Sequence, residues 1–254
     1  MGFSGGTDIG TDIGTDGGAK SMPVFVEDTA PGDVVEVQII KRKKSFAEAR
    51  LIKIVKPSSV RTQPRCKHFG VCGGCSWQFL PYEEQLKWKE KFVRETLEHV
   101  GGFHDVVVEP IVSNSDEDSE SDSDGVAREP WLYRNKMEWS FDKKSGIDAG
   151  LHVRGRWHDV VHIEECFLQS EKSLEIFKAI REFFQRALTP PRSVFVREGK
   201  RTGEMMVVLN FENSPDTKVG QKNHFKNNNE FVHALIAKFP EIISIAIRNE
   251  IIFG

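Results

Sequence analysis

The chain has 254 residues, of which 39% are hydrophobic and 29% charged, and its formal net charge is −3. This is the composition of a globular protein with room for one large domain or two smaller ones. No run of about 18 apolar residues could cross a bilayer, and the N-terminus lacks the charged and apolar regions of a signal peptide. We therefore expect no membrane partner and an intracellular location. The cytoplasm is the favoured compartment, and an organelle and the nucleus stay open as alternatives.

The N-terminal segment, residues 1–22, opens with the repeat GTDIGTDIGTDGG. It carries aspartates and lacks the arginines that are typical of a transit peptide. A polar, low-complexity composition of this kind cannot bury enough apolar surface to fold. We predict a disordered tail.

The next segment, residues 23–65, is basic and shows the alternation of β-strands. Its part from 31 to 65 carries nine Lys or Arg against three acids, and apolar residues alternate over 32–40 and 47–55, on either side of the turn KRKKSF. We predict a basic hairpin in a small OB-like β-barrel that binds nucleic acid through phosphate contacts. A solvated charged hairpin without a ligand is the alternative. The candidate binding residues are Lys41, Arg42, Lys43, Lys44, Arg50, Lys53, Arg61 and Arg65.

Residues 66–112 combine a cysteine-rich loop with a helix. The run CKHFGVCGGC contains Cys66, Cys72 and Cys75, separated by five residues and then by two. Apolar residues then recur at helical spacing between a proline and a pair of glycines, which predicts an amphipathic helix over 82–100.

Residues 113–125, SNSDEDSESDSDG, hold six acids and no base, which predicts an acidic disordered insertion and a candidate phosphorylation target. The rest of the chain, 126–254, has the patterns of a mixed domain, so the predicted fold class is α+β. The expected elements are strands over 131–141 and in DAGLHVRG and WHDVVHI, a helix over 173–188, a hairpin over 193–211, a helix near 229–239 and a closing strand IISIAI.

The fourth cysteine, Cys166, lies 91 positions after Cys75. Disulfides are disfavoured, because nothing indicates secretion and a bridge across the two glycines before Cys75 would be strained. A four-thiolate zinc site stays open, although zinc sites usually assemble from two local pairs. Three cysteines on one glycine-containing loop and one distant cysteine suit the four corners of a [4Fe-4S] cubane, and the spacing favours that cluster over zinc.

The sequence closely resembles the RNA uracil-C5 methyltransferases, which make 5-methyluridine in ribosomal and transfer RNA. The resemblance covers residue 31 to the C-terminus. It rests on PGDVVEVQI, on KSFAEARLIKIVKPSSVRTQPRCKHFGVCGGCSWQFLPYEEQLKWK, and on YRNKMEWSF, GLHVRGRWHDVVHIEECFLQS and GKRTGEMMVVL.

The resemblance implies a TRAM domain in the basic segment and a central α+β domain organised around a four-cysteine iron–sulfur site. It implies structured RNA, either rRNA or tRNA, as the partner, and it gives no indication of an obligate protein partner. By the same resemblance Arg134 and Lys136 are candidates for RNA contact or for support of the cluster, and the ligands of the [4Fe-4S] cluster are Cys66, Cys72, Cys75 and Cys166.

The family's chemistry needs groups that we do not find in these residues. A cysteine thiolate adds to uracil C6, C5 takes the methyl group of S-adenosylmethionine, and a base removes the C5 proton. All four cysteines are assigned to the cluster, and no glycine-rich loop links a strand to a helix as a doubly wound cofactor domain requires.

We therefore expect the RNA-recognition portion of an S-adenosylmethionine-dependent rRNA or tRNA uracil-5-methyltransferase. On this interpretation the catalytic domain is absent from the chain, no catalytic or S-adenosylmethionine-binding residue is present, and the chain is inactive alone. The alternative is a stand-alone noncatalytic RNA-binding iron–sulfur or zinc protein. An electron carrier is a third class, which requires an exposed cluster.

Overall fold

The computed structural model describes residues 22–113, 131–142, 148–185, 190–212 and 228–250. The predicted tail and the predicted acidic insertion lie, except for one residue each, outside the described residues. The chain divides into two compact units, one of Met1–Arg65 with Ser76–Arg128 and one of Cys66–Cys75 with Glu129–Gly254. None of the helices in the described ranges is long and apolar enough to span a membrane.

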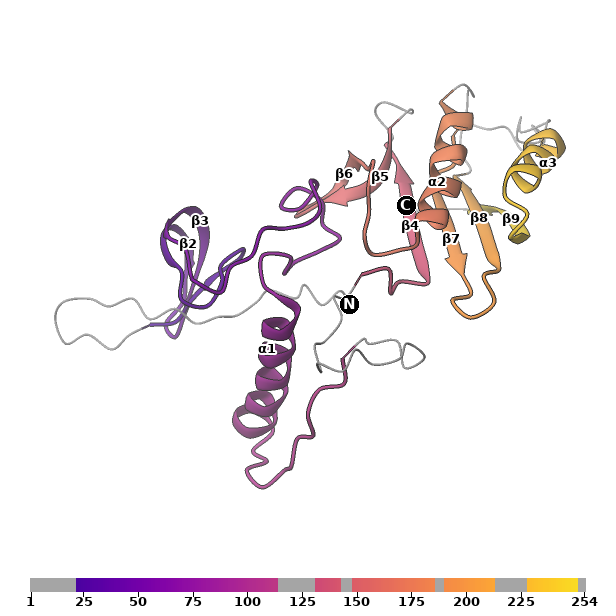
Figure 1. Ribbon diagram of the computed structural model, residues 1–254. Coiled ribbons are helices and arrows are strands. Elements are labelled where there is room, and N and C mark those ends of the chain that lie inside the picture. The colour runs from indigo at the N-terminus through magenta and orange to yellow at the C-terminus, as the bar shows by residue number, and fades with distance from the viewer. Residues whose placement is uncertain (1–21, 114–130, 143–147, 186–189, 213–227, 251–254) are drawn as a thin grey trace. The chain divides into compact units, whose positions relative to one another are not determined.

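The first unit is built on a three-stranded sheet in the order β1-β3-β2 (Figure 1). Strand β1 (Val24–Val26) runs parallel to β3 (Ala47–Lys56), and β3 pairs antiparallel with β2 (Val34–Arg42). The predicted hairpin is confirmed. The described residues of this unit form a three-stranded sheet with β1 and β2 at its edges, so the expected OB-like barrel is not confirmed.

A buried carboxylate, Asp33, holds the segments on either side of this sheet together. Its side chain is 1% exposed and accepts hydrogen bonds from Nε and Nη2 of Arg61 at 2.8 and 2.6 Å. The backbone N–H groups of Ala30 and Ser58 donate to the same carboxylate at 2.7 and 2.8 Å. Burial by itself raises the pKa of Asp33, but these hydrogen bonds outweigh it and hold the pKa below its ordinary value of 3.8.

The predicted helix after the cysteines is confirmed as α1 (Tyr82–Glu95), which continues into a π-helical turn, Thr96–Val100. Pro81 precedes it with a φ of −56°, close to the helical value, so the fixed proline ring suits the start of the helix. The side chain of Gln85 donates to the carbonyls of Trp77 and Leu80, which secures the first turn.

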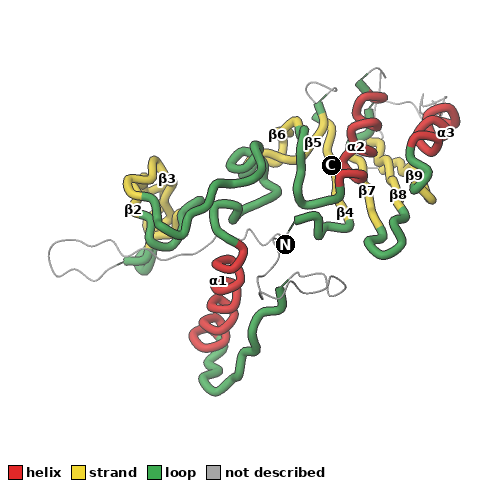
Figure 2. Tube along the Cα trace, viewed as in Figure 1, coloured by secondary structure: helices red, strands yellow, loops and turns green. Residues whose placement is uncertain are grey.

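The second unit is a six-stranded sheet with two helices, which confirms the α+β fold class (Figure 2). The strand order is β6-β5-β4-β7-β8-β9, and every pairing is antiparallel except that of β8 with β9. The elements are β4 (Lys136–Phe141), β5 (Ala149–Val153), β6 (Arg156–His162), α2 (Glu171–Phe184), β7 (Ser193–Glu198), β8 (Met205–Glu212), α3 (Asn228–Lys238) and β9 (Ile242–Glu250).

Aromatic side chains fill the core between the sheet and α2. Ser170 caps this helix by accepting a hydrogen bond from the N–H of Ser173 at 3.1 Å. The apolar side chains of Ile176, Phe177, Ile180 and Phe184 on this helix are completely buried, and the ring of Phe177 stacks on that of Trp139 with centroids 4.2 Å apart. Burial of this stripe, not intrinsic helix propensity, supplies most of the helix's stability.

The first prediction concerns Asp33. We expect Asp33→Asn to lower the free energy of unfolding of the first unit by about 3 kcal/mol at neutral pH, because Arg61 loses the partner of a largely buried charge. The folded-state pKa lies below the unfolded value, so the carboxylate stabilises the fold above about pH 4, and that contribution disappears as the pH falls through the folded pKa. Urea unfolding as a function of pH measures both effects.

The matched control is Glu36→Gln, which breaks an exposed ion pair with Lys53 at 3.1 Å. Exposed pairs contribute roughly 0.2–1 kcal/mol, so this variant should keep nearly all of the stability and the full acid dependence. Equal pH dependence in Asp33→Asn and the wild type would show that Asp33 does not carry this contribution.

Candidate metal centre and nucleic-acid surface

The cysteine loop, Cys66–Cys75, folds with the second unit and not with the helix that follows it in sequence. Its backbone pairs with the hairpin of β5 and β6. The N–H of Gly73 donates to the carbonyl of His152, and the N–H of Arg154 donates to the carbonyl of Val71, both at 2.9 Å. These two bonds bring three of the four cysteines onto the unit that carries the fourth.

The two glycines of the loop allow this approach. A Cβ atom on Gly73 would lie 3.2 Å from the carbonyl oxygen of His152, closer than nearly all real Cβ contacts. The N–H of Gly74 donates to the sulfur of Cys72 at 3.4 Å. The glycine pair therefore lets a backbone amide reach a cysteine sulfur while the loop stays against the strand.

The segment that carries Cys166 is an irregular loop between β6 and α2, and the cysteine loop is likewise irregular (Figure 2). The N–H groups of Leu132 and Arg134 donate to the carbonyls of the two residues after Cys166, both at 2.8 Å. Before it, the buried guanidinium of Arg181 on α2 donates to the carbonyl of Ile163 at 2.8 Å. Both flanks of the fourth cysteine are thus fixed by the fold.

Hydrogen bonds and an ion pair join the residues that follow Cys66 to the residues that precede Cys166. The N–H of Lys67 donates to Oε1 of Glu165 at 2.8 Å, and its ammonium forms an ion pair with Glu164. Nε2 of His68 accepts from the N–H of Glu164 at 3.2 Å, which gives this ring nitrogen a partner other than a metal. Sequence reasoning missed this contact. Its signal was a lysine directly after the first cysteine and two glutamates directly before the last.

The four thiols influence one another electrostatically. Burial raises the pKa of Cys166 to about 11, and repulsion from the three loop thiols adds to the increase. Burial likewise raises the pKa values of Cys66 and Cys72, again with repulsion from the neighbouring thiols. Four thiolates gathered here would repel one another in a partly buried place, and a bound cation would offset that repulsion.

The four cysteines supply the kind of donor atoms that a thiolate-bound metal group requires. Backbone N–H groups already donate to the sulfurs of Cys66, Cys72 and Cys166, as they do around protein-bound iron–sulfur clusters. All four cysteines are free thiols. Within the described ranges, however, no three His, Cys, Asp or Glu side chains form a group that could hold a metal ion. The predicted cluster is thus not confirmed and remains a proposal.

The candidate RNA-binding residues of the β2–β3 hairpin divide into two kinds. Three have partners on the opposite strand: Lys41 pairs with Glu48 at 3.5 Å, Lys53 with Glu36 at 3.1 Å, and Arg50 donates to Gln38 at 2.9 Å. At the turn, the exposed side chains of Arg42, Lys43 and Lys44 form no ion pair within the described part of the chain. Uncompensated positive charge of the hairpin is therefore concentrated at its turn.

Arg61 and Arg65 lie beyond the hairpin. The guanidinium of Arg61 is held by Asp33 and lies 4.7 Å over the ring of Phe79, and its side chain is only 17% exposed. Its RNA contact stays a prediction, but these contacts show that Arg61 has a structural role within the first unit. Arg65 is exposed, at the end of the first unit.

Arg134 and Lys136 belong to the second unit, so the ten candidate residues do not share one unit. Arg134 lies close enough to Cys72 to favour its thiolate, and its Nη1 contacts the sulfur of Met137 at 3.6 Å. Support of the cysteine site is therefore the role its surroundings favour. Lys136 is exposed on β4, with its ammonium 4.5 Å over the ring of Phe195.

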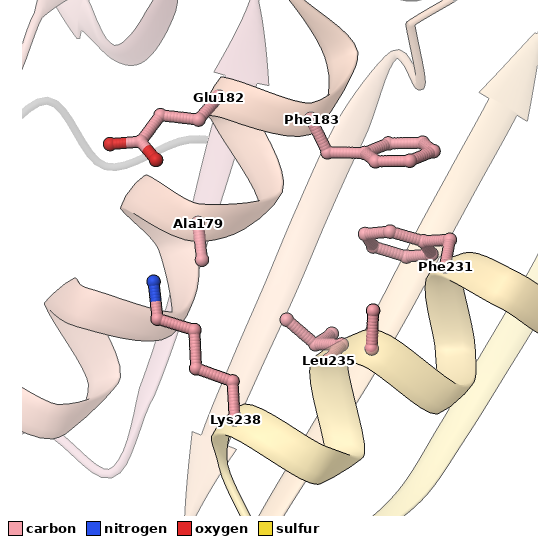
Figure 3. A pocket seen from close by; sticks show the side chains of 7 residues that line it. Ala179, Glu182, Phe183, Phe231, Leu235 and Lys238 are labelled. Atoms are coloured by element: carbon pink, nitrogen blue, oxygen red, sulfur yellow. The ribbon is translucent and has the colours of Figure 1, made fainter.

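A separate pocket of about 450 Å³ lies between α2 and α3. Figure 3 shows the rings of Phe183 and Phe231 facing one another at one end of it, with centroids 4.4 Å apart. Its only charged lining residues are Glu182 and Lys238. The pocket has no nucleophile beside a base, so its lining does not form a catalytic site of the acyl- or methyl-transfer kind.

Residues 9–52 match the family model of the TRAM domain. An "Uncharacterized RNA methyltransferase" of Bacillus cereus is 31% identical over 251 residues, covering 92% of this chain and 50% of that protein. One from Bacteroides thetaiotaomicron is 30% identical over 251 residues, covering 89% and 51%. The chain is similar to RNA methyltransferases. It spans about half the length of the curated relatives it matches.

Among solved structures, the tRNA (uracil-54, C5)-methyltransferase of Pyrococcus abyssi in complex with S-adenosyl-L-homocysteine is 25% identical. That match covers 77% of this chain and 44% of the other, with a TM-score of 0.47. The predicted TRAM domain is confirmed by its family model. The matches give no support to the expected absence of a catalytic domain, and they do not favour the noncatalytic alternative, since the relatives named RNA methyltransferase match along about nine-tenths of this chain.

The second prediction tests the four-cysteine site. Protein purified without oxygen should be brown and contain about four irons and four sulfides per chain, as four-thiolate cubane ligation implies. Cys166→Ser should reduce iron and visible absorption as much as Cys72→Ser does, because each removes one corner. His68→Ala, which alters the neighbouring ring without removing a thiol, should retain the iron. A colourless protein with one zinc per chain after anaerobic reconstitution would rule out the cluster.

Proposed function

We propose that the chain is the RNA-recognition portion of an RNA methyltransferase of the uracil-C5 class, with rRNA or tRNA as substrate. The observation that carries the proposal is the concentration of uncompensated cations, Arg42, Lys43 and Lys44, at the turn of a hairpin within a confirmed TRAM domain. The similarity to proteins named RNA methyltransferase supports the activity. S-adenosylmethionine is the methyl donor that this activity implies.

The hairpin suits the backbone of RNA more than a protein surface of mixed charge. Cross-strand ion pairs neutralise Lys41 and Lys53, while the turn keeps three adjacent positive side chains in solvent. Each cation that neutralises a phosphate releases condensed counterions, so such a turn contributes affinity without reading sequence. The choice of a uridine must then come from other contacts.

The [4Fe-4S] cluster, in this proposal, has a structural task. Cys66, Cys72, Cys75 and Cys166 would hold it, and its iron would compensate the charge of the four thiolates. The cysteine loop is bonded to the β5–β6 hairpin, and the segment before Cys166 is bonded to α2. Ligation at four corners would therefore join the loop, the hairpin and the helix into one rigid part of the second unit.

The third prediction concerns the hairpin turn. Replacing Arg42, Lys43 and Lys44 together with Ala should weaken binding to structured RNA and lower the slope of log affinity against log salt by roughly 2, since each lost phosphate contact removes about 0.7 to 0.9. Filter binding over a series of salt concentrations measures the slope. The control is Lys53→Ala, whose ammonium is already paired with Glu36, and its slope should stay near that of the wild type. An unchanged slope in the triple variant would remove the turn from the RNA surface.

The fourth prediction separates ligand cysteines from a catalytic one. In uracil-C5 methylation a thiolate sulfur bonds to C6, and RNA containing 5-fluorouridine traps that adduct because fluorine replaces the C5 proton that must leave. If all four cysteines here hold the cluster, none of their peptides should carry the adduct after digestion and mass spectrometry. An adduct at any of the four would show that this cysteine is a nucleophile and would contradict the four-ligand site.

A further inference from the structure

The β5–β6 hairpin exposes a tryptophan near its tip. Trp157 is 71% exposed, whereas Trp139 on β4 is completely buried. Tryptophan is the largest apolar side chain, and a surface position for it is costly unless a ligand covers the ring. β6 is an edge strand of the sheet, so one side of this hairpin is open along its length.

The surroundings of Trp157 are aromatic and basic. The ring of His158 lies against it with centroids 3.2 Å apart. The side chain of Arg156 is 66% exposed and forms an ion pair with Asp159 at 3.1 Å. Arg154 precedes them at the turn, next to Gly155, whose φ of +69° permits the tight reversal of the chain. A flat apolar ring is thus placed among positive side chains.

Hydrogen bonds with the cysteine loop fix the position of the hairpin tip. Besides the two backbone bonds already described, the guanidinium of Arg154 donates to the carbonyl of Cys75 at 3.1 Å. Cys72 also forms a β-bridge with Val153, directly before the turn. A ring on a fixed backbone loses little conformational freedom when a ligand stacks on it, which favours binding.

We propose that Trp157 is a stacking platform for an unpaired RNA base, with the exposed side chain of Arg156 beside it for an adjoining phosphate. The inference rests on the proposed RNA-binding function and adds to it a site in the second unit. Proteins recognise unpaired bases by stacking them on aromatic rings beside cations, because every base has a π-face and every nucleotide a negative charge. The platform would bind single-stranded or looped RNA, whereas the turn of the first unit contacts phosphates in any RNA.

A protein partner is the competing occupant of an exposed tryptophan. The charges favour RNA: the run RGRWH contains two arginines, a histidine and no acid, so the segment stays net positive even with Asp159, which pairs with Arg156. Protein interfaces of this polarity would need acidic residues opposite the arginines, and RNA supplies negative charge together with planar rings.

The test compares two single-stranded RNA oligomers of about 12 nucleotides, one of mixed sequence and one with the same backbone but abasic. Trp157→Ala should weaken binding of the mixed-sequence oligomer roughly tenfold, the effect of one lost stacking contact. Trp157→Phe should retain most of the affinity, because it keeps an aromatic face. Binding of the abasic oligomer and the salt slope should not change in either variant, since no phosphate contact is lost.

Ile243→Ala is the matched control, because Ile243 is 66% exposed on β9 of the same unit and is apolar but not aromatic. It should bind both oligomers as the wild type does, and circular dichroism should show all three variants folded. Wild-type affinity in Trp157→Ala, with RNA binding and its salt slope intact, would overturn the stacking site alone and leave a protein partner for the hairpin. Absence of RNA binding by the wild type would overturn the proposed function and the stacking site together.

Discussion

The backbone pairing between the cysteine loop and the β5–β6 hairpin is the contact on which the rest of the second unit's site depends. Two backbone hydrogen bonds, from the N–H of Gly73 to the carbonyl of His152 and from the N–H of Arg154 to the carbonyl of Val71, attach the loop to the second unit. In sequence the loop is adjacent to the segment that leads to α1, which belongs to the first unit. The loop can approach so closely only because glycine has no side chain. Together with the contacts of Lys67 and His68 to the two glutamates before Cys166, this pairing fixes the three loop thiols relative to Cys166.

The same pairing links two features of different chemistry. On one side of the contact lie the four thiols, and partial burial of Cys66, Cys72 and Cys166 disfavours negative charge on these three, so a cationic group is the natural complement. On the other side lies an exposed tryptophan with arginines around it. A cluster that fixes the loop would also fix the hairpin, which gives a physical reason for an iron–sulfur group in a protein whose proposed ligand is RNA.

Basic residues have unequal roles in this protein, and burial decides between them. Arg61 and Arg181 both lie largely within the fold, the first held by Asp33 and the second by the carbonyl of Ile163. Lys41 and Lys53 on the hairpin strands are paired with glutamates on the opposite strand. Positive charge stays available to a partner mainly at the turn, where, among the described residues, no acidic residue of an opposite strand lies across from Lys43 and Lys44.

The sequence by itself determined the elements, and with them the α+β class, because their signals are local. The apolar stripe of α2, the alternation in β2 and β3, and the glycine-bounded cysteine loop each depend on residues only a few positions apart. The sequence also indicated which cysteines belong together, through their spacing and the resemblance it carries.

Only the tertiary structure decided which unit holds the cysteine loop, that Arg61 supports the fold, and that Trp157 is exposed on a braced hairpin. Each of these depends on a partner far along the chain: His152 for Gly73, Asp33 for Arg61, and the cysteine loop for the hairpin. Residue type and local period do not encode such partners, since burial and pairing arise only when distant segments pack together.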